Sequence, residues 1–351
     1  MLMQRNSHRY YVRPIFSKIK KKNSLFLGSS KLFFNEIEII HRSKDKIYRK
    51  FLTLEEVENQ PMHIKKIINE QIKNITSKRQ EIGKIHLDRP VLMGILNVTP
   101  DSFFDGGKYL SITKAIDQTK ILIKEGADII DLGGESTRPG SKQISIKEEI
   151  KRVVPVISRI RKLQKKVFLS IDTRKSAVMK EALKHKINLV NDVSGLRYDK
   201  QSIKFLSTNK VPFILMHSIS TPEKMQKEIN YSDVVLDVYD FFLKQIQLCE
   251  KFNISKNRII IDPGIGFGKT LQQNLKLIKN ISLFHSLGLP ILLGSSRKSF
   301  IGKIEKNELY QDRLGGSIAT VLFALAEGVQ IFRVHDVYAT KQAIKTFSSI
   351  K

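Results

Sequence analysis

The sequence is poor in residues that stabilise proteins through disulfides or metals. It has one cysteine, Cys249, which excludes an internal disulfide and is typical of a reducing compartment. We interpret Cys249 as a small apolar residue on a helix, without a chemical role. The eight histidines include no HExxH motif and no cluster with cysteine, so nothing in the pattern predicts a structural zinc site.

Long apolar runs are also absent. No window approaches the roughly 18 consecutive apolar residues that a membrane-spanning helix needs, and no run near the start is flanked like a secretory signal. We therefore expect no membrane partner and a cytoplasmic location. With 41% hydrophobic residues in 351, the chain can bury one large core or two modest ones.

Acidic residues are few, 34 against 61 lysines and arginines, which gives a formal charge of +27. Residues 1–85 hold 19 basic and 8 acidic residues and the remaining 266 hold 42 and 26, so the excess is spread along the chain. A nucleic-acid surface is more often a compact basic patch with interleaved aromatic residues. We therefore expect solvated surface lysines and no nucleic-acid partner, although a positive field attracts anionic substrates.

Residues 1–85 contain little glycine or proline and no recognisable catalytic cluster. The stretch KLFFNEIEIIH alternates like a strand, and HIKKIINEQIKNI has the period of an amphipathic helix. We expect a small N-terminal extension of unknown role that is dispensable for the chemistry. The arginines near the start also fit an organellar transit peptide, but the segment continues into patterned, foldable sequence.

Residues 86–351 follow a regular alternation of short apolar runs and helical segments. The runs are at 91–97, 128–134, 167–173, 187–192, 211–217, 258–264, 290–299 and 331–336. The helical segments that follow them are at 112–126, 146–163, 176–185, 200–208, 231–252, 270–288, 313–328 and 337–349. Eight strand–helix units in about 260 residues are typical of an α/β fold of the TIM (β/α)8 barrel type.

Each predicted strand ends in polar residues, at the barrel end where this fold builds its sites. These strand ends are Asn97, Glu135 to Arg138, Asp172, Asn191 with Asp192, His217, Asp262, Ser296 to Lys298, and Arg333 with His335. Single polar residues at loop starts are ordinary turn chemistry, but eight converging on one rim predict a binding site.

The residue types indicate what this site binds. Asp172, Asn191 and Asp262 can hold a flat heterocycle rich in N–H donors and carbonyl acceptors, such as a pterin or a purine. Arg333 and His335 lie two apart on a strand, so they face the same side and form a cationic fork suited to phosphate oxygens. The stretch PGIGFGKT has three residues, not four, between Gly264 and Gly268, and is therefore not a phosphate-binding P-loop.

Seven segments together resemble the dihydropteroate synthase family of folate biosynthesis. They are MGILNVTPDSFFDGG, GADIIDLGGESTRPG, LSIDTRK, NDVSG, DPGIGFGK, GSSRKSFIG and RVHDV, in the family's order and covering roughly Pro90 to the C-terminus. The resemblance implies a transferase that joins the diphosphate ester of hydroxymethyl-dihydropterin to 4-aminobenzoate and releases diphosphate. It also implies a homodimer and magnesium as the cofactor.

The resemblance assigns a role to each matching residue. Asn97 is implied to contact Mg²⁺, and Thr137 the pterin ester. The residues implied to hold or line the pterin are Asp172, Asn191, Met216, Asp262, Phe267 and Lys298. Arg333 and His335 are implied to bind the diphosphate, with Arg138 and Ser299 at the aminobenzoate end. Asp172, Lys298, Arg333 and His335 form the implied catalytic set. Arg333 and His335, with Mg²⁺, are implied to neutralise charge on the leaving diphosphate, and Asp172 to stabilise positive charge on the pterin methylene.

One departure and two alternatives accompany this resemblance. Phe104 stands where the family usually has a small serine, so we expect it to pack against the barrel or to narrow the aminobenzoate entrance. A pterin-binding methyltransferase with a similar barrel would not need the STRPG loop or the terminal RVH, and both are present. A non-catalytic homologue, or a basic RNA-associated protein that uses residues 1–85, is the other alternative.

Overall fold

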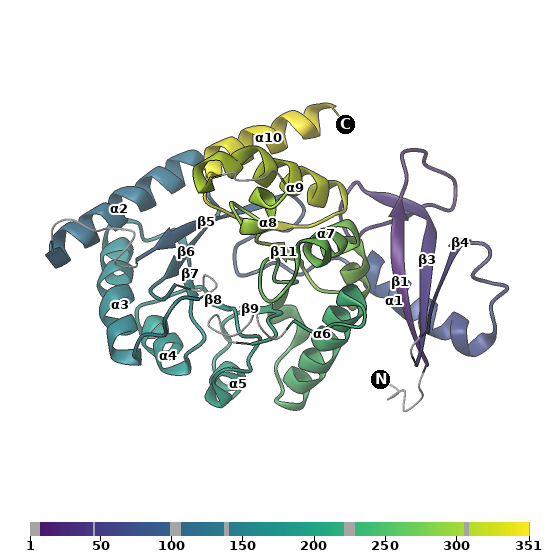
Figure 1. The fold of residues 1–351 in the computed structure, drawn as a ribbon, viewed down its shortest axis with the longest axis horizontal. Coiled ribbons are helices and arrows are strands. Elements are labelled where there is room, and N and C mark those ends of the chain that lie inside the picture. The colour runs from purple at the N-terminus through teal and green to yellow at the C-terminus, as the bar shows by residue number, and fades with distance from the viewer. Residues whose placement is uncertain are drawn as a thin grey trace.

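Figure 1 shows the computed structural model, which describes residues 8–44, 46–98, 107–136, 140–220, 229–304 and 309–350. Of residues 107–111 it describes the backbone alone. A barrel fills most of the molecule, and the N-terminal extension lies beside it, next to α6 (Figure 1). None of the helices in the described ranges is long and apolar enough to cross a membrane.

The barrel is an eight-stranded parallel sheet in the order β10-β9-β8-β7-β6-β5-β12-β11. A parallel bridge between Ile261 and Ile291 joins the two outer strands. The strands are short apolar runs buried on both faces, as covered parallel strands are. Their bounds are β5 (Val91–Asn97), β6 (Ile129–Gly133), β7 (Phe168–Asp172), β8 (Leu189–Asp192), β9 (Phe213–Met216), β10 (Ile259–Asp262), β11 (Leu292–Leu293) and β12 (Ile331–Val334). The TIM-barrel prediction is confirmed.

The helices surround this sheet with their apolar stripes facing inward. They are α2 (Gly107–Glu125), α3 (Ile146–Leu163), α4 (Ser176–Lys184), α5 (Lys200–Thr208), α6 (Val234–Lys251), α7 (Leu271–Lys279), α9 (Leu314–Ala326) and α10 (Val337–Ile350), with a one-turn α8 (Ser299–Gly302). The described residues also form the 3-10 helices η2 (Lys256–Arg258), η3 (Ile281–Leu287) and η4 (Tyr310–Arg313). Side chains cap the starts of α3, α5, α6 and α7, as where Ser145 accepts from the Glu148 amide at the start of α3.

The segment 270–288 corrects the sequence-based prediction of a single helix. Helix α7 ends at Lys279, and η3 follows with all seven of its residues buried. An α-helix that continued here would turn some of these side chains to solvent. The 3-10 helix instead keeps them between the barrel and the N-terminal extension.

The N-terminal extension folds as an antiparallel sheet with one long helix. Its elements are β1 (His8–Phe16), β2 (Leu25–Phe26), β3 (Phe33–Ser43), β4 (Lys46–Thr53) and α1 (Met62–Thr76), with β3 paired to β1, β2 and β4. The predicted strand and the predicted helix of this region are β3 and α1. Val12, Phe34, Ile37, Ile68 and Ile75 form a core between the sheet and α1.

The extension is attached to the barrel through buried and charged contacts. Tyr11, 1% exposed, packs edge-on against Tyr239 of α6 at 5.1 Å and donates to Asp240 at 3.1 Å. Asn74 and Arg79 donate to carbonyl oxygens of η3, those of Ser286 and His285, at 2.9 and 3.1 Å. The extension and the barrel therefore share a core. The predicted division between 1–85 and 86–351 separates an antiparallel sheet from a parallel barrel, but the two pack against each other.

The last residues before β5 close the lower end of the barrel, which is the end where the strands begin. Ile82 and Ile85 form a two-residue bridge, with both backbone bonds at 3.0 Å, and pack against the first residues of the strands. Ile82 is 2% exposed. A chain cut between residues 85 and 86 would lose Ile82 and Ile85. The barrel core therefore includes residues that precede the predicted domain boundary, and the boundary itself stays a prediction.

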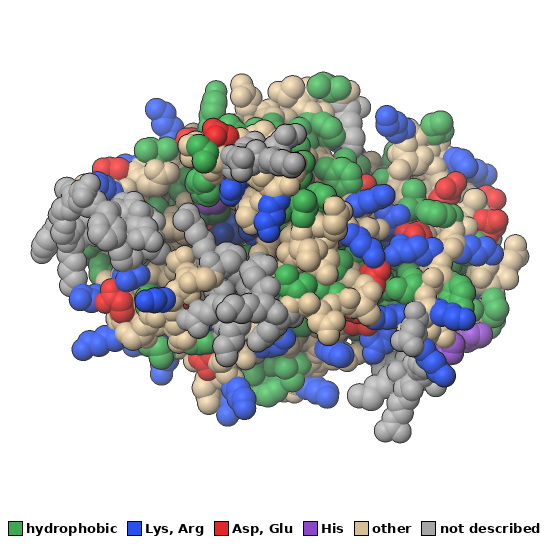
Figure 2. Space-filling view, viewed as in Figure 1, with side chains coloured by type: hydrophobic (Ala, Val, Ile, Leu, Met, Phe, Trp, Pro, Cys, Tyr) green, Lys and Arg blue, Asp and Glu red, His purple; other side chains and the backbone are tan. Residues whose placement is uncertain are grey.

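The surface charge is spread as the composition predicts. Lysine and arginine side chains are scattered over the visible face and do not gather in one patch (Figure 2). Several arginines are committed to ion pairs, such as Arg13 with Glu38 at 2.6 Å and Arg297 with Asp336 at 2.5 Å.

Candidate active site

Strand register brings the first polar residues together in one row. Asn97 of β5 pairs with Gly133 of β6, Gly133 with Asp172 of β7, and Asp172 with Asn191 of β8. Gly133 leaves room between its neighbours, since a Cβ there would lie 3.6 Å from Asn97 Oδ1 and 3.7 Å from Asp172 Oδ2. The amide of Asn97 and the carboxylate of Asp172 therefore lie on either side of Gly133 at the carboxyl end of the barrel strands.

Arg333 of β12 reaches into this row. Its Nη2 donates to Asp172 at 2.9 Å, and its Nε donates to Asp131 of β6 at 2.7 Å. Asp131 is completely buried and also accepts from Asn191 at 3.0 Å. A guanidinium has five N–H donors, so three remain after these two bonds. Arg333 thus links two acidic strands while it can still bind an anion.

The Asp172 carboxylate is prepared to accept a ligand. Burial raises its pKa to about 8; the neighbouring Arg333 guanidinium opposes this rise without cancelling it, and Asp131 adds to it. Its Oδ1 is buried and has no hydrogen-bond partner among the described residues. A buried unpaired carboxylate oxygen is unfavourable unless something binds it. This oxygen is the clearest acceptor position in the site.

A second wall comes from β9, β10 and the loop after β11. Met216 pairs with Asp262, and a Cβ on Gly294 would lie 3.8 Å from both Asp262 Oδ2 and the Cβ of Arg333. Burial raises the pKa of Asp262, and Lys298 opposes this rise. The Lys298 ammonium lies 4.4 Å from the centre of the Phe267 ring and donates to the Ile265 carbonyl. This wall therefore combines a carboxylate, an ammonium and an aromatic face.

Lys298 is held in an environment that disfavours its charge. Burial lowers its pKa to about 8, with Arg333 contributing, while Asp262 and Asp172 oppose the change. A lysine with a pKa near 8 is partly neutral just above physiological pH. Its ability to bind an acceptor therefore varies with pH in the working range.

The last polar strand end lies beside the same mouth. His335, one residue past β12, has its Nδ1 3.0 Å from the hydroxyl of Ser296. Its backbone amide also donates to Ser296, at 3.2 Å. Ser299 is exposed and begins α8 directly after Lys298. The structure thus places Asn97, Asp172, Asn191, Met216, Asp262, Phe267, Lys298, Ser299, Arg333 and His335 on the strand ends and loops of one barrel end.

Comparison with known proteins identifies the family. The pterin binding enzyme family matches residues 93–335. The dihydropteroate synthase of Synechocystis is 42% identical over 262 residues, which are 75% of this chain and 90% of the relative. The chain belongs to the dihydropteroate synthase family. It is a transferase of folate biosynthesis that carries out dihydropteroate synthesis.

Solved structures of this family agree. The Yersinia pestis dihydropteroate synthase, solved with a sulfonamide drug complex, has a TM-score of 0.72 and 39% identity, and the match covers 98% of it and 77% of this chain. The Xanthomonas albilineans dihydropteroate synthase with 4-aminobenzoic acid has a TM-score of 0.70 and 40% identity, over 94% of it and 75% of this chain. This chain therefore carries sequence beyond the shared barrel.

Three of the predicted positions lie outside the described residues. They are Phe104 in the first loop and Thr137 and Arg138 in the second. The base of the second loop is described. Glu135 accepts from the Ile144 amide at 2.9 Å, and so joins the two ends of the segment that contains Thr137 and Arg138.

Glu135 belongs to a buried charge cluster that sequence reasoning missed. It pairs with Arg174 at 3.0 Å and Lys175 at 2.8 Å, and Lys175 also pairs with Glu149 at 2.7 Å. All four residues are at most 7% exposed. The signal in the sequence was two adjacent cations directly after β7, but their partners come from other elements. Glu135 was expected at the rim of the site and instead supports the loop from below.

A second supporting contact lies under the glycine-rich loop 263–268. The Lys269 ammonium donates to the carbonyls of Gly264 and Phe267, both at 2.9 Å, and lies 3.0 Å from the imidazole of His217. Gly264 has a φ of +69°, and a Cβ there would clash with the His217 carbonyl oxygen. The stretch that resembles a P-loop is thus a tight turn wrapped around a lysine, and His217 belongs to its support.

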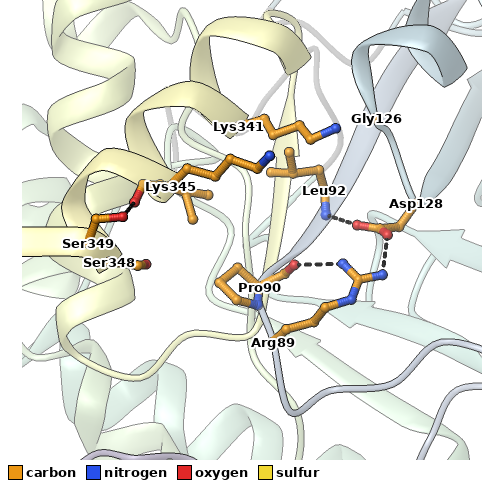
Figure 3. Close-up of a pocket in the computed structure, with 10 residues that line it drawn as sticks. Arg89, Pro90, Leu92, Gly126, Asp128, Lys341, Lys345, Ser348 and Ser349 are labelled. Carbon is orange, nitrogen blue, oxygen red and sulfur yellow. Dashed lines mark hydrogen bonds and ion pairs between the residues drawn. The ribbon is translucent and has the colours of Figure 1, made fainter. Parts of the chain in front are cut away.

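A cavity of about 460 Å³ lies elsewhere, between the start of β5 and α10 (Figure 3). Arg89 and Asp128 pair there at 2.6 Å, and Lys341 and Lys345 approach from α10. These residues precede β5 and β6, so the cavity is at the end of the barrel opposite the site. It contains none of the residues to which the resemblance assigns a role.

Proposed function

We propose that the row from Asn97 to Asn191, with Arg333 above Asp131, binds the dihydropterin diphosphate substrate of this dihydropteroate synthase. The observation that carries the proposal is the buried Oδ1 of Asp172, which has no hydrogen-bond partner among the described residues and lies next to the Arg333 guanidinium, whose other N–H groups can bind an anion. An acceptor and an anion-binding fork side by side match a substrate with a donor-rich ring and a diphosphate.

The pterin end of the substrate would lie between the two walls. Asp172, Asn191 and Asp262 supply the polar edge that reads the N–H donors and carbonyl of the ring. Lys298 donates to a ring acceptor. Met216 and Phe267 line the flat faces, since one is a buried thioether and the other a half-buried ring.

The diphosphate end would meet Arg333 and His335. In the reaction, the bond from the pterin methylene carbon to the diphosphate oxygen breaks, and the oxygen keeps the electron pair. The nitrogen of 4-aminobenzoate then forms a bond to that carbon and loses a proton. Arg333 and His335 would neutralise the charge that grows on the leaving group, and Asp172 would stabilise the positive charge on the methylene. No nucleophilic residue of the protein is needed.

Magnesium fits this site only as an ion that accompanies the diphosphate. Among the described residues, no group of three or more histidine, cysteine, aspartate or glutamate side chains could hold a metal. Asn97 offers one amide oxygen, its Oδ1, which lies on the opposite side of Gly133 from the Asp172 carboxylate. Mg²⁺ is often bound by few protein ligands together with substrate phosphates and water. Asn97 would hold it, and the bound ion would add positive charge beside the leaving diphosphate.

The aminobenzoate end would be shaped by the two loops. Ser299 is exposed at the start of α8, next to Lys298. We assign Thr137 to the pterin ester and Arg138 to the aminobenzoate end, on the strength of the matching motif. The structure of the Xanthomonas albilineans relative holds 4-aminobenzoic acid, which supports this substrate for the present chain.

We also propose a cytoplasmic homodimer. Helix α9 is almost entirely apolar, and Gly315, Ala319 and Phe323, spaced four apart, are exposed on one of its faces. Phe323 alone is 43% exposed. An apolar helix face left in water favours association. Sedimentation of the Phe323→Glu variant tests this, because a monomer is expected only if α9 forms the interface.

The activity is tested by diphosphate release. The full chain should release diphosphate only when both the dihydropterin diphosphate and 4-aminobenzoate are present with Mg²⁺, and one dihydropteroate should form per diphosphate. Release without 4-aminobenzoate, or no dihydropteroate, would contradict the proposal.

A further inference from the structure

The N-terminal extension touches the barrel at the entry to α6. Arg42, near the end of β3, pairs through Nη1 with Asp237 at 2.7 Å and lies 3.5 Å from Asp240. Its Nη2 donates to the Ser232 hydroxyl. The Arg42 side chain is 19% exposed. One guanidinium of the extension therefore holds both the chain that leads into α6 and the first turn of that helix.

The segment Tyr231 to Asp237, which we name the α6 entry turn, is ordered around the same carboxylate. Asp237 accepts from the backbone amides of Ser232 at 2.9 Å and Asp233 at 3.2 Å. Asp233 in turn caps α6 and accepts from Lys276 of α7 at 2.8 Å. Because Asp237 serves both the entry turn and Arg42, the position of the turn depends on a residue of the extension.

The α6 entry turn also touches the glycine-rich loop of the site. The Tyr231 hydroxyl donates to the Gly268 carbonyl at 3.1 Å, and its ring centre lies 6.0 Å from that of His217. Gly268 follows Phe267, whose ring faces Lys298. A contiguous set of contacts therefore leads from β3 of the extension to the aromatic wall of the pterin site.

We propose that Arg42 is a positioning residue for pterin binding, acting through the α6 entry turn and the bond from Tyr231 to Gly268. The extension is thus a built-in clamp for the glycine-rich loop. The inference rests on the proposed role of Phe267 and Lys298 at the pterin end of the substrate. Chains of the family that consist of the barrel alone have to fix this loop by other contacts, whereas this chain uses an added sheet.

The test compares two arginines of the extension in the full chain. Arg42→Ala is expected to raise KM for the dihydropterin diphosphate about five-fold, with kcat changed less than two-fold and KM for 4-aminobenzoate unchanged. Arg9→Ala is the matched control. Arg9 pairs with Asp240 of the same helix at 2.6 Å, and no contact joins it to the entry turn among the described residues. Arg9→Ala should lower thermal stability by a similar amount and leave both KM values unchanged.

A double-mutant cycle tests the route. Tyr231→Phe removes only the hydroxyl that bonds to Gly268, so it should raise the same KM. Adding Arg42→Ala to it should then have little further effect, because both changes release the same loop. Arg42→Lys should restore part of the affinity, since an ammonium can pair with Asp237 without also holding Ser232. If Arg42→Ala does not fold, Ser232→Ala replaces it, with a smaller rise in KM expected.

Three outcomes would overturn the inference: equal KM values in Arg42→Ala and Arg9→Ala, a KM change confined to 4-aminobenzoate, or full additivity in the cycle. Its failure is distinct from failure of the proposed function. If the unaltered chain releases no diphosphate, the function fails. In that case calorimetric binding of 6-hydroxymethyl-7,8-dihydropterin still compares the Arg42 and Arg9 variants and decides the inference.

Discussion

A single arginine carries most of the electrostatic balance at the mouth of the barrel. Arg333 separates Asp131 and Asp172, two buried carboxylates on neighbouring strands, and it is the guanidinium bonded to both. Its presence keeps the Asp172 carboxylate more acidic than burial alone would allow. Removing this cation would therefore affect both the leaving-group contact and the charge of Asp172.

We expect Arg333→Ala to lower kcat by about 10²-fold or more, because the charge on the departing diphosphate loses its partner. Steady-state kinetics measure the loss, and circular dichroism of the soluble variant checks that the fold persists. Asp172→Ala should reduce kcat by a similar factor. Activity within about three-fold of the unaltered chain in either soluble variant would reject its role.

Lys298 predicts a pH dependence of substrate binding. Its pKa is lowered to about 8, first by burial, so the ammonium is lost as pH rises through about 8. KM for the dihydropterin diphosphate should therefore rise between pH 7 and 9. Lys298→Arg should flatten this profile, since a guanidinium keeps its charge throughout. A KM that rises equally in both proteins would assign the effect to another group.

The same shift has a consequence for stability, with a definite sign. A lysine whose pKa is lower in the folded state destabilises the fold in its charged form. Between pH 8 and the ordinary value of 10.5 the unfolded chain binds more protons, so this residue's contribution to the unfolding free energy rises with pH. Lys298→Met should remove that slope in urea unfolding curves taken across this range.

At the scale of elements, the sequence predicted the barrel because continuous apolar strands and helical segments alternate in a way few other folds allow. It also predicted which strand ends meet, since parallel strands bring their carboxyl ends to one rim. Asp131 was missed because it lies inside an apolar strand, two residues before the strand end. The pairing of Lys175 with Glu149 was missed because the partners lie 26 residues apart in sequence. Such contacts depend on side-chain packing, which local patterns do not encode.

The buried charge cluster beneath the second loop should be a structural support. Lys175→Met would leave Glu135 and Glu149 buried without this shared cation, and burial already raises the pKa of Glu149. We expect a loss of about 3–5 kcal/mol in the free energy of unfolding, measured in urea. Lys184→Met is the control, because its pair with Glu181 is exposed and should change stability by less than about 0.5 kcal/mol.

A double variant separates the charge effect from lost packing. Adding Glu149→Gln to Lys175→Met removes the uncompensated carboxylate while keeping its shape. This should recover a large part of the lost stability. If the double variant is as unstable as the single one, the stability comes from packing of the lysine stem and the cluster is not an electrostatic support.

At the scale of the whole molecule, the N-terminal extension is continuous with the barrel core. From the sequence alone, all eight strand–helix units follow Arg89, which favoured a dispensable extension. That the chemistry does not need the extension stays a prediction. The structure adds that the barrel is covered at the amino-terminal ends of its strands. Ile82 and Ile85 supply that cover from outside the repeating units.

We therefore expect Ile82 to contribute more to the free energy of unfolding than residues of a connecting segment usually do. Ile82 is 2% exposed and packs with the first residues of the strands, among them Val91, Met93 and Ile129, which are fully buried. Ile82→Ala should lower the free energy of unfolding by about 2–4 kcal/mol, because it opens a cavity among buried side chains that the barrel strands hold in place. Ile19→Ala is the matched control, since that side chain is 74% exposed and its loss should stay within about 0.5 kcal/mol. Urea unfolding of both variants measures the difference. Equal and small losses would show that the barrel closes without Ile82, and a chain shortened to residue 86 would then be expected to fold and turn over.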